Sequence, residues 1–422
     1  MSEKERIVDF SLMKEEPAFM QTLRQNSLEL IDTLEFPKIE RVNYTRWNLF
    51  SDTFDKEEEM TNSVPSFEAM RDNAALVQVG TQTLMEQLPQ DLIEKGVVLT
   101  DIFTAMTEYP ELVEKYYMTS VKPDEDKMSA HHATYMNSGV FLYVPKEVKI
   151  DEPIELTLFQ NSESDVAFNK HILIVADTHS EFTYIEKLQT IGNGNERVTA
   201  NVLVEVVALD GAKIKYSAID RLGENVVSFI ARRGHLKENA EIDWAVGVMN
   251  DGLTAYDLDS DLIGNASHAD MKVVAISSGR QVQGIDTRVT NYGHHSIGNI
   301  LQHGVILDRS SLTFNGIGHI IKGAKFADAQ QESRVLMLSD KARGDANPIL
   351  LIDENEVTAG HAASIGRVDP DDMYYLMSRG IEPKEAQRLV IRGFLGAVIT
   401  AMPSRTLQEE FIEMIERKLS AL

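Results

Sequence analysis

The chain has 422 residues, 43% of them hydrophobic and 25% charged, which is the composition of a globular protein with a substantial buried core. Its 66 acidic and 41 basic residues give a formal net charge of −25. This charge argues against nucleic acid and anionic membrane surfaces as partners, because both are bound mainly through Lys and Arg. The absence of cysteine excludes disulfides, thiolate zinc sites and an iron–sulfur cluster held by this chain's own sulfur atoms.

No targeting signal is visible. The N-terminal sequence lacks the apolar run of a signal peptide, and no later stretch reaches the roughly 18 to 20 apolar residues of a membrane-spanning helix. We therefore expect a cytoplasmic protein.

The first part of the chain is predicted to be a mainly helical domain, residues 1–136. Apolar residues recur at helical spacing between Pro17 and Leu34. Further helical patterns are expected from Val64 into the eighties, over Leu92–Lys95 and over Ile102–Tyr117.

A β core is predicted over residues 137–366. Short runs rich in Val, Ile, Thr and aromatic residues follow one another there, and each is closed by Gly, Asn, Asp or Ser. No helix-length pattern separates them, so a βαβ sheet is improbable. Repetition over more than 200 residues favours a β-solenoid modestly over a large sandwich.

Three helices are predicted in a C-terminal domain, residues 367–422. Asp369 and Pro370 form a helix start, and Gly380 ends that helix. A second helix begins at Pro383 and a third near Thr406, both with continuous apolar stripes. These stripes must pack either on the β core, which is the simpler alternative, or on another chain.

Familiar catalytic and metal motifs are absent: the sequence has no phosphate loop, no HExxH zinc helix and no GxSxG elbow. A column of histidines in a stacked β core could bind a metal, although exposed turn or satisfied core positions are the better explanation of these side chains. The histidines considered for such a column are His294, His295, His303 and His319, with His131 and His132 weaker candidates.

The segment from Asn347 to Leu395 carries the most specific signal. It reads NPILLIDENEVTAGHAASIGRVDPDDMYYLMSRGIEPKEAQRLVIRGFL and resembles the carboxy-terminal signature of the SufB/SufD family of iron–sulfur cluster assembly proteins. The earlier NSGVFLYVPKEVKIDEPIEL resembles the family's entry into its β core. Within the family the resemblance is to the SufD branch. SufB proteins carry a cysteine just before the acidic and histidine positions of this motif, whereas SufD proteins have a histidine there, which in this chain is His361. The resemblance implies a right-handed parallel β-helix flanked by N- and C-terminal helical domains.

The resemblance also implies a role. It predicts a non-catalytic scaffold subunit that pairs with a SufB-like subunit and a SufC-like ATPase, with a transient iron–sulfur cluster at the interface with SufB. His361 is then a candidate ligand shared with that partner; the alternative is a hydrogen bond from His361 that locks a strand-to-helix turn. The residues expected to dock the ATPase are Tyr374, Tyr375, Arg379, Gly380, Gly393 and Phe394.

Two other functions stay open at this point. A β-helical carbohydrate-active enzyme could use paired carboxylates, such as Asp257 with Asp259 or Asp270 with Asp286, as acid and base. A homodimer formed by the isolated chain is the other alternative. Removal of all residues after Gly366 is expected to abolish ATPase binding and to leave the β core folded.

Overall fold

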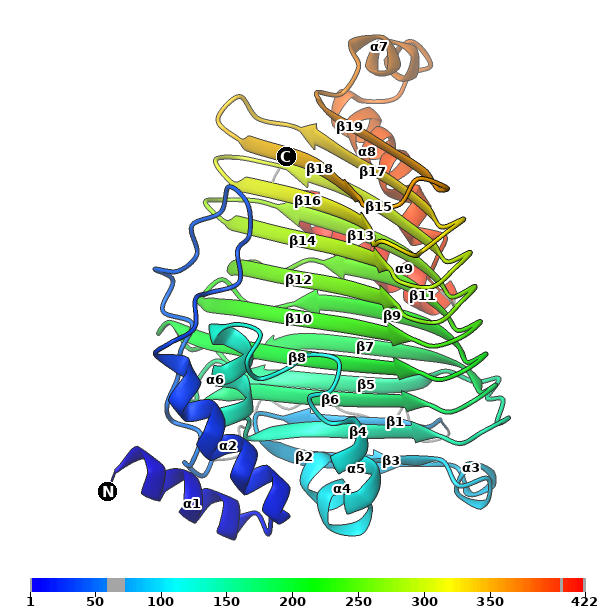
Figure 1. The fold of residues 1–422 in the computed structure, drawn as a ribbon. Helices are drawn as coiled ribbons and strands as arrows, with labels where there is room; N and C mark the ends of the chain where they lie inside the picture. The colour runs from blue at the N-terminus through cyan, green and yellow to red at the C-terminus, as the bar shows by residue number, and fades with distance from the viewer. Residues whose placement is uncertain (1, 59–72, 403–404, 420–422) are drawn as a thin grey trace.

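Two facing β-sheets form the centre of the protein in the computed structural model, which describes residues 2–58, 73–402 and 405–419 (Figure 1). Successive strands from β4 onward alternate between the sheets and pair in parallel with the strand one turn away. The chain therefore winds as a parallel β-helix, as predicted.

The ten-stranded sheet contains, in spatial order, β19 (Thr358–Gly366), β17 (Asp328–Met337), β15 (Ile297–Ile306), β13 (His268–Ser277), β11 (Glu241–Val248), β9 (Lys213–Arg221), β7 (Glu181–Ile191), β5 (Ile154–Asn161), β1 (Ala75–Val79) and β2 (Gln82–Gln87). The nine-stranded sheet contains β18 (Arg343–Ile352), β16 (Ser311–Ile320), β14 (Val282–Asn291), β12 (Leu253–Leu262), β10 (Val226–Leu236), β8 (Val198–Ala208), β6 (Phe168–Ala176), β4 (Ser138–Val144) and β3 (Val98–Asp101).

The main core lies between the two sheets. Alternate residues of each strand point inward, because successive side chains of a strand leave on opposite faces. The pairing is in register, so inward residues stack in columns; one column runs through Tyr184, Tyr216, Trp244 and Met271, all buried. This stacking gives each turn an apolar layer that only its neighbours can cover.

The predicted helix from Val64 into the eighties is wrong where the structure describes it. Residues 75–87 form the hairpin of β1 and β2, and β1 joins the ten-stranded sheet beside β5. The rest of that prediction, 64–72, lies outside the described residues. Every residue of β1 is buried, so the strand shows no alternation of buried and exposed residues. Its run of apolar residues therefore looks like that of a buried helix.

The other predicted N-terminal helices are present. The helices are α1 (Glu3–Met13), α2 (Ala18–Ile31), α3 (Gln90–Glu94), α4 (Ile102–Glu108), α5 (Pro110–Tyr116) and α6 (Lys127–Tyr135). Between α2 and β1, residues 36–50 cross the outer face of the nine-stranded sheet as an extended segment, which we call the strap. Its Ile39, Tyr44 and Leu49 are buried against β10 and β12.

The C-terminal helices are α7 (Pro370–Ser378), α8 (Pro383–Ile399) and α9 (Arg405–Leu419). The apolar stripes of α8 and α9 pack on the outer face of the ten-stranded sheet, where Leu395 and Phe411 meet Ile219 and Val274. Helix α7 buries no residue and projects beyond the end of the β-helix (Figure 1). Within residues 2–58, 73–402 and 405–419, no helix is both long and apolar enough to cross a bilayer.

Candidate functional site at the open end of the β-helix

The last two strands leave one end of the β-helix uncovered. In the described part of the chain, β19 pairs only with β17, and β18 pairs only with β16. Most residues of both strands are exposed or half-buried, including Leu351, Ile352 and Ile365. An edge of this kind presents unpaired backbone N–H and C=O groups and is a template for a further strand.

Small residues dominate the terminal strand β19, which reads TAGHAASIG. Such a strand has little intrinsic preference for β structure, and it lets another backbone approach closely. His361 is its only imidazole and the strand has no carboxylate; the histidine is flanked by Gly360 and Ala362. The strand thus exposes one imidazole in a setting without bulky neighbours of its own.

The sequence places His361 at the end of the β core, after a predicted strand over Ile349–Ile352 and before the helix start at Asp369; the structure shows it within a further strand, β19. It is in register with Gln331 of β17, which is in register with Ile300 of β15. Both of those residues are buried and inward-facing, so His361 stands at the top of an inner column. Among described residues its imidazole has no hydrogen-bond partner, and the turn-locking bond is not present.

A polar groove of about 530 Å³ lies beside His361 on the ten-stranded sheet. Its lining includes Asp270, Lys272, Asn299, Gln330 and Glu332. Asp270 accepts hydrogen bonds from His268 and Asn299, which hold the pKa of its carboxyl down at about 2. The groove is open and carries a carboxylate that stays charged at neutral pH.

A metal site cannot be completed at this end by the described residues alone, because they contain no group of three or more His, Asp or Glu side chains able to hold an ion. The histidine column is not formed: His303 lies in the ten-stranded sheet and His319 in the nine-stranded one. His295 stacks on Phe326, and His319 contacts Asp353. His361 can therefore offer one ligand of a shared site.

Helix α7 carries the exposed part of the predicted docking set. Tyr374 is 73% exposed and Tyr375 58% exposed. The Arg379 guanidinium lies over the Tyr375 ring, 5.2 Å from its centroid, and Gly380 ends the helix with φ of +87°. Exposed aromatic rings next to an arginine are typical anchors of protein interfaces.

The two docking residues predicted on α8 differ from each other. Gly393 is exposed and faces open space. Phe394 is half-buried and stacks on His303 with ring centroids 4.7 Å apart, while its carbonyl oxygen accepts a bond from His303 Nδ1. His303 thus attaches α8 to the β core, and the Phe394 ring is already partly used within the chain.

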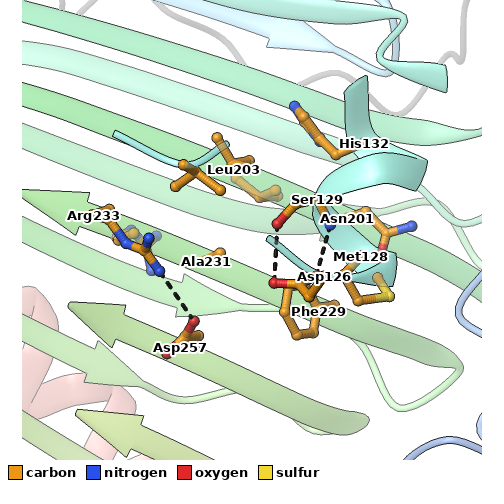
Figure 2. Close-up of a pocket in the computed structure, with 13 residues that line it drawn as sticks. Asp126, Met128, Ser129, His132, Asn201, Leu203, Phe229, Ala231, Arg233 and Asp257 are labelled. Atoms are coloured by element: carbon orange, nitrogen blue, oxygen red, sulfur yellow. Dashed lines mark hydrogen bonds and ion pairs between the residues drawn. The ribbon is translucent and has the colours of Figure 1, made fainter. Parts of the chain in front are cut away.

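A second group of polar residues lies under α6 on the nine-stranded sheet (Figure 2). Arg233 contacts Asp259 at 3.1 Å and Asp257 at 3.9 Å, and Asp126 receives hydrogen bonds from Ser129. The enclosed free volume is about 20 Å³, enough for one water molecule. The cluster joins α6 to the sheet and leaves no room for a sugar.

The other proposed carboxylate pair is not formed. Asp270 lies on β13 in the ten-stranded sheet and Asp286 on β14 in the nine-stranded sheet, so they belong to opposite walls of the β-helix. Acid and base of a glycosidase must flank one bond. The structure gives no support to the carbohydrate alternative.

Sequence reasoning missed an outward polar ladder near the open end. Asp286, Asn315 and Asn347 are in register on β14, β16 and β18 and are joined by side-chain hydrogen bonds. The residues are 29 and 32 positions apart, which is one turn of the β-helix, so only a search at that period could have found them.

Comparison with known proteins agrees with these features. The family model described as SUF system FeS cluster assembly, SufBD core domain, matches residues 158–394, and the SufBD N-terminal region matches residues 8–156. The iron-sulfur cluster assembly protein SufD of Bacillus subtilis is 43% identical over 99% of this chain and 98% of its own length. SufBD family proteins of Staphylococcus epidermidis and Staphylococcus aureus are 24% and 25% identical over 94% of this chain, covering 89% and 88% of the relatives. The chain belongs to the SufBD family of iron–sulfur cluster assembly proteins of the SUF system.

Proposed function

We propose that this protein is a non-catalytic scaffold subunit in which the open end of the β-helix pairs with a SufB-like subunit. The observation that carries the proposal is the exposed, unpaired edge of β18 and β19, with His361 as the only imidazole or carboxylate side chain of β19. A strand edge needs a strand to cover it, and a single imidazole needs further ligands to hold a metal.

The cluster is the cargo of this site. Because the chain has no cysteine, every thiolate around a nascent iron–sulfur cluster must come from the partner. A neutral imidazole nitrogen is a borderline ligand suited to iron. His361 would complete the ligand set of the cluster, and the paired strand edges would hold the cluster at the junction. In this role the chain itself turns over no substrate.

Helix α7 is proposed to dock a SufC-like ATPase. Tyr374, Tyr375 and Arg379 form an exposed patch at the same end of the molecule as the open edge (Figure 1). Because α8 and α9 bind the outer face of the ten-stranded sheet, a pull on α7 is transmitted to the β-helix through packed apolar side chains.

The test of the site is His361→Ala in the complex co-expressed with the SufB-like and SufC-like subunits. We expect iron and sulfide content to fall at least fivefold with unchanged complex recovery, since one ligand is lost and the strand edges are not. His294→Ala, at an exposed turn, is the matched control and should retain its clusters. Full cluster content in the His361 variant would refute the ligand role.

The test of the docking helix is the double variant Tyr374→Ala with Tyr375→Ala. The truncation after Gly366 suggested by the sequence is less specific. It would expose the sheet face that α8 and α9 cover and so disrupt more of the structure than the docking site. The double variant should lower ATPase co-purification about tenfold or more, as loss of aromatic anchors does. Ile93→Ala, 50% exposed on α3, should change nothing; undiminished binding by the double variant would exclude α7.

A further inference from the structure

The polar ladder on the outer face of the nine-stranded sheet ends at the open edge. Asn315 Nδ2 donates to Asp286 Oδ1 at 2.5 Å, and Asn347 Nδ2 donates to Asn315 Oδ1 at 2.8 Å. Each amide therefore donates toward β14, and each is held by the strand below it. Bonds in such a chain polarise one another and strengthen the acceptor at its end.

The last acceptor of this ladder is unfilled. The amide group of Asn347 is planar, and its nitrogen is directed at β16, so its oxygen is directed toward the side where the next strand would lie. No donor within the described residues bonds to that oxygen, and Asn347 is only half-buried. By contrast, Asn315 is fully buried and all its bonding groups on this face are used.

The strap covers the polar ladder where it crosses β14 and β16 but leaves Asn347 on β18 uncovered. The carbonyl oxygen of Glu40 accepts the second N–H of Asn315 at 3.2 Å. The side chain of Val42 covers Gly284 on β14, where a Cβ atom would lie 2.8 Å from it. The tip of the strap reaches β18 through Arg41, whose guanidinium lies 3.5 Å from Asp345. Asn347 is the first rung beyond this cover.

We propose that the ladder continues into the SufB-like partner, whose edge strand presents a side-chain N–H or O–H donor to Asn347 Oδ1 and is thereby held in one register. This rests on the proposed function, because it assumes that the partner pairs with the open end. Backbone bonds alone do not distinguish a correct register from one slipped by two residues. A slipped partner would bury the Asn347 oxygen without a donor, which is costly.

The experiment measures pairing of the full chain with the SufB-like subunit for Asn347→Leu and for the control Asn201→Leu. Asn201 makes the same kind of bond, to Asn169 at 3.1 Å, but on β8, which has strands on both sides. Because Asn201 also bonds to the Leu49 carbonyl, the thermal unfolding of the control should shift at least as far as that of Asn347→Leu. Pairing should weaken about tenfold for Asn347→Leu and less than twofold for Asn201→Leu.

A third variant separates this inference from the proposed function. Ala363→Pro removes from β19 a backbone N–H that faces the open edge, because the N–H of Thr358 donates to β17 and successive residues of a strand alternate sides. If Ala363→Pro abolishes pairing and Asn347→Leu does not weaken it more than Asn201→Leu, the ladder inference is overturned and end-to-end pairing stands. If pairing is indifferent to Ala363→Pro, pairing through the open end is refuted together with the ladder. A selective loss with Asn347→Leu alongside a loss with Ala363→Pro supports both.

Discussion

A single arginine organises the charged interior of the β-helix. Arg232 is fully buried on β10 and bonds to Glu186 at 2.5 Å and to Asp220 at 2.7 and 2.9 Å. The hydroxyl groups of Tyr216 and Tyr256 also contact its guanidinium. Burial, partly offset by Arg232, raises the pKa of Asp220 to about 6. Two buried carboxyl groups thus depend on one cation.

Replacing this arginine should destabilise the protein strongly. We expect Arg232→Met to lower the free energy of unfolding by about 3–5 kcal/mol at pH 7.5, because the carboxylates stay buried without a cation. The loss should shrink toward pH 5, since Asp220, whose pKa is raised by burial to about 6, can then take up a proton and become neutral. Urea unfolding at the two pH values measures this effect.

The matched control for that variant is Lys213→Met. Lys213 pairs with Glu241 at 2.9 Å on the surface, with about half of its side chain exposed, and should contribute less than about 1 kcal/mol. Equal losses for the two variants, or a loss for Arg232→Met that does not change with pH, would contradict the view that burial makes the difference.

At the scale of elements, close contacts decide how the C-terminal helices sit on the sheet. The Phe411 ring of α9 lies against Gly247 of β11, where a Cβ atom would come within 2.2 Å of the ring. Phe411 is fully buried and belongs to the cluster that also includes Leu395 and Val274. The helix can approach the sheet only because residue 247 has no side chain.

Adding one methyl group there should loosen the helix. Gly247→Ala is expected to cost about 1–3 kcal/mol through overpacking, because the ring and the strand cannot both keep their positions. Gly396→Ala in α8, which meets nothing within 4 Å, should instead stabilise by about 0.5–1 kcal/mol through helix propensity. Thermal unfolding of both variants checks this, and hydrogen exchange in α9 should rise only for Gly247→Ala.

At the scale of the whole molecule, the two ends of the β-helix differ. At the start, the antiparallel strands β2 and β3 end the two sheets. At the other end, β18 and β19 lie open; neither contains lysine, and Pro348 of β18 removes one backbone donor from the edge. A chain with a net charge of −25 is otherwise well protected against self-association.

The isolated chain should therefore dimerise weakly through this end. We expect sedimentation velocity at physiological salt to show a concentration-dependent dimer for the wild type and a monomer for Ala362→Lys, since pairing would have to desolvate the new ammonium group. Ala397→Lys, at an exposed position of α8, should dimerise like the wild type. A wild type that remains monomeric at high concentration would contradict this expectation.

How far the site could be predicted depends on the range of the interactions. His361 and the tyrosines of α7 lie in one continuous motif, so a resemblance over fifty residues was enough to select them. The helix prediction over β1 and β2 was wrong because that strand is buried on both faces and shows no alternation. The sequence could not show that Phe394 packs within the chain, because its partner His303 is 91 residues away.

The sequence by itself determined that the chain forms a β-helix with helical ends, that it holds no thiolate and that His361 lies near the end of the core. The lack of thiolates follows from residue types and the helical ends from local periodicity, whereas the β-helix and the role expected of His361 follow from the resemblance to the SufB/SufD family, because periodicity alone favoured a β-solenoid only modestly. Only the tertiary structure decided that the end stays open, that Phe394 packs inward, and that Asp286, Asn315 and Asn347 form a ladder pointing out of the molecule. Those features depend on contacts between residues one or more turns apart, whose geometry is set by strand register and not by the order of neighbours.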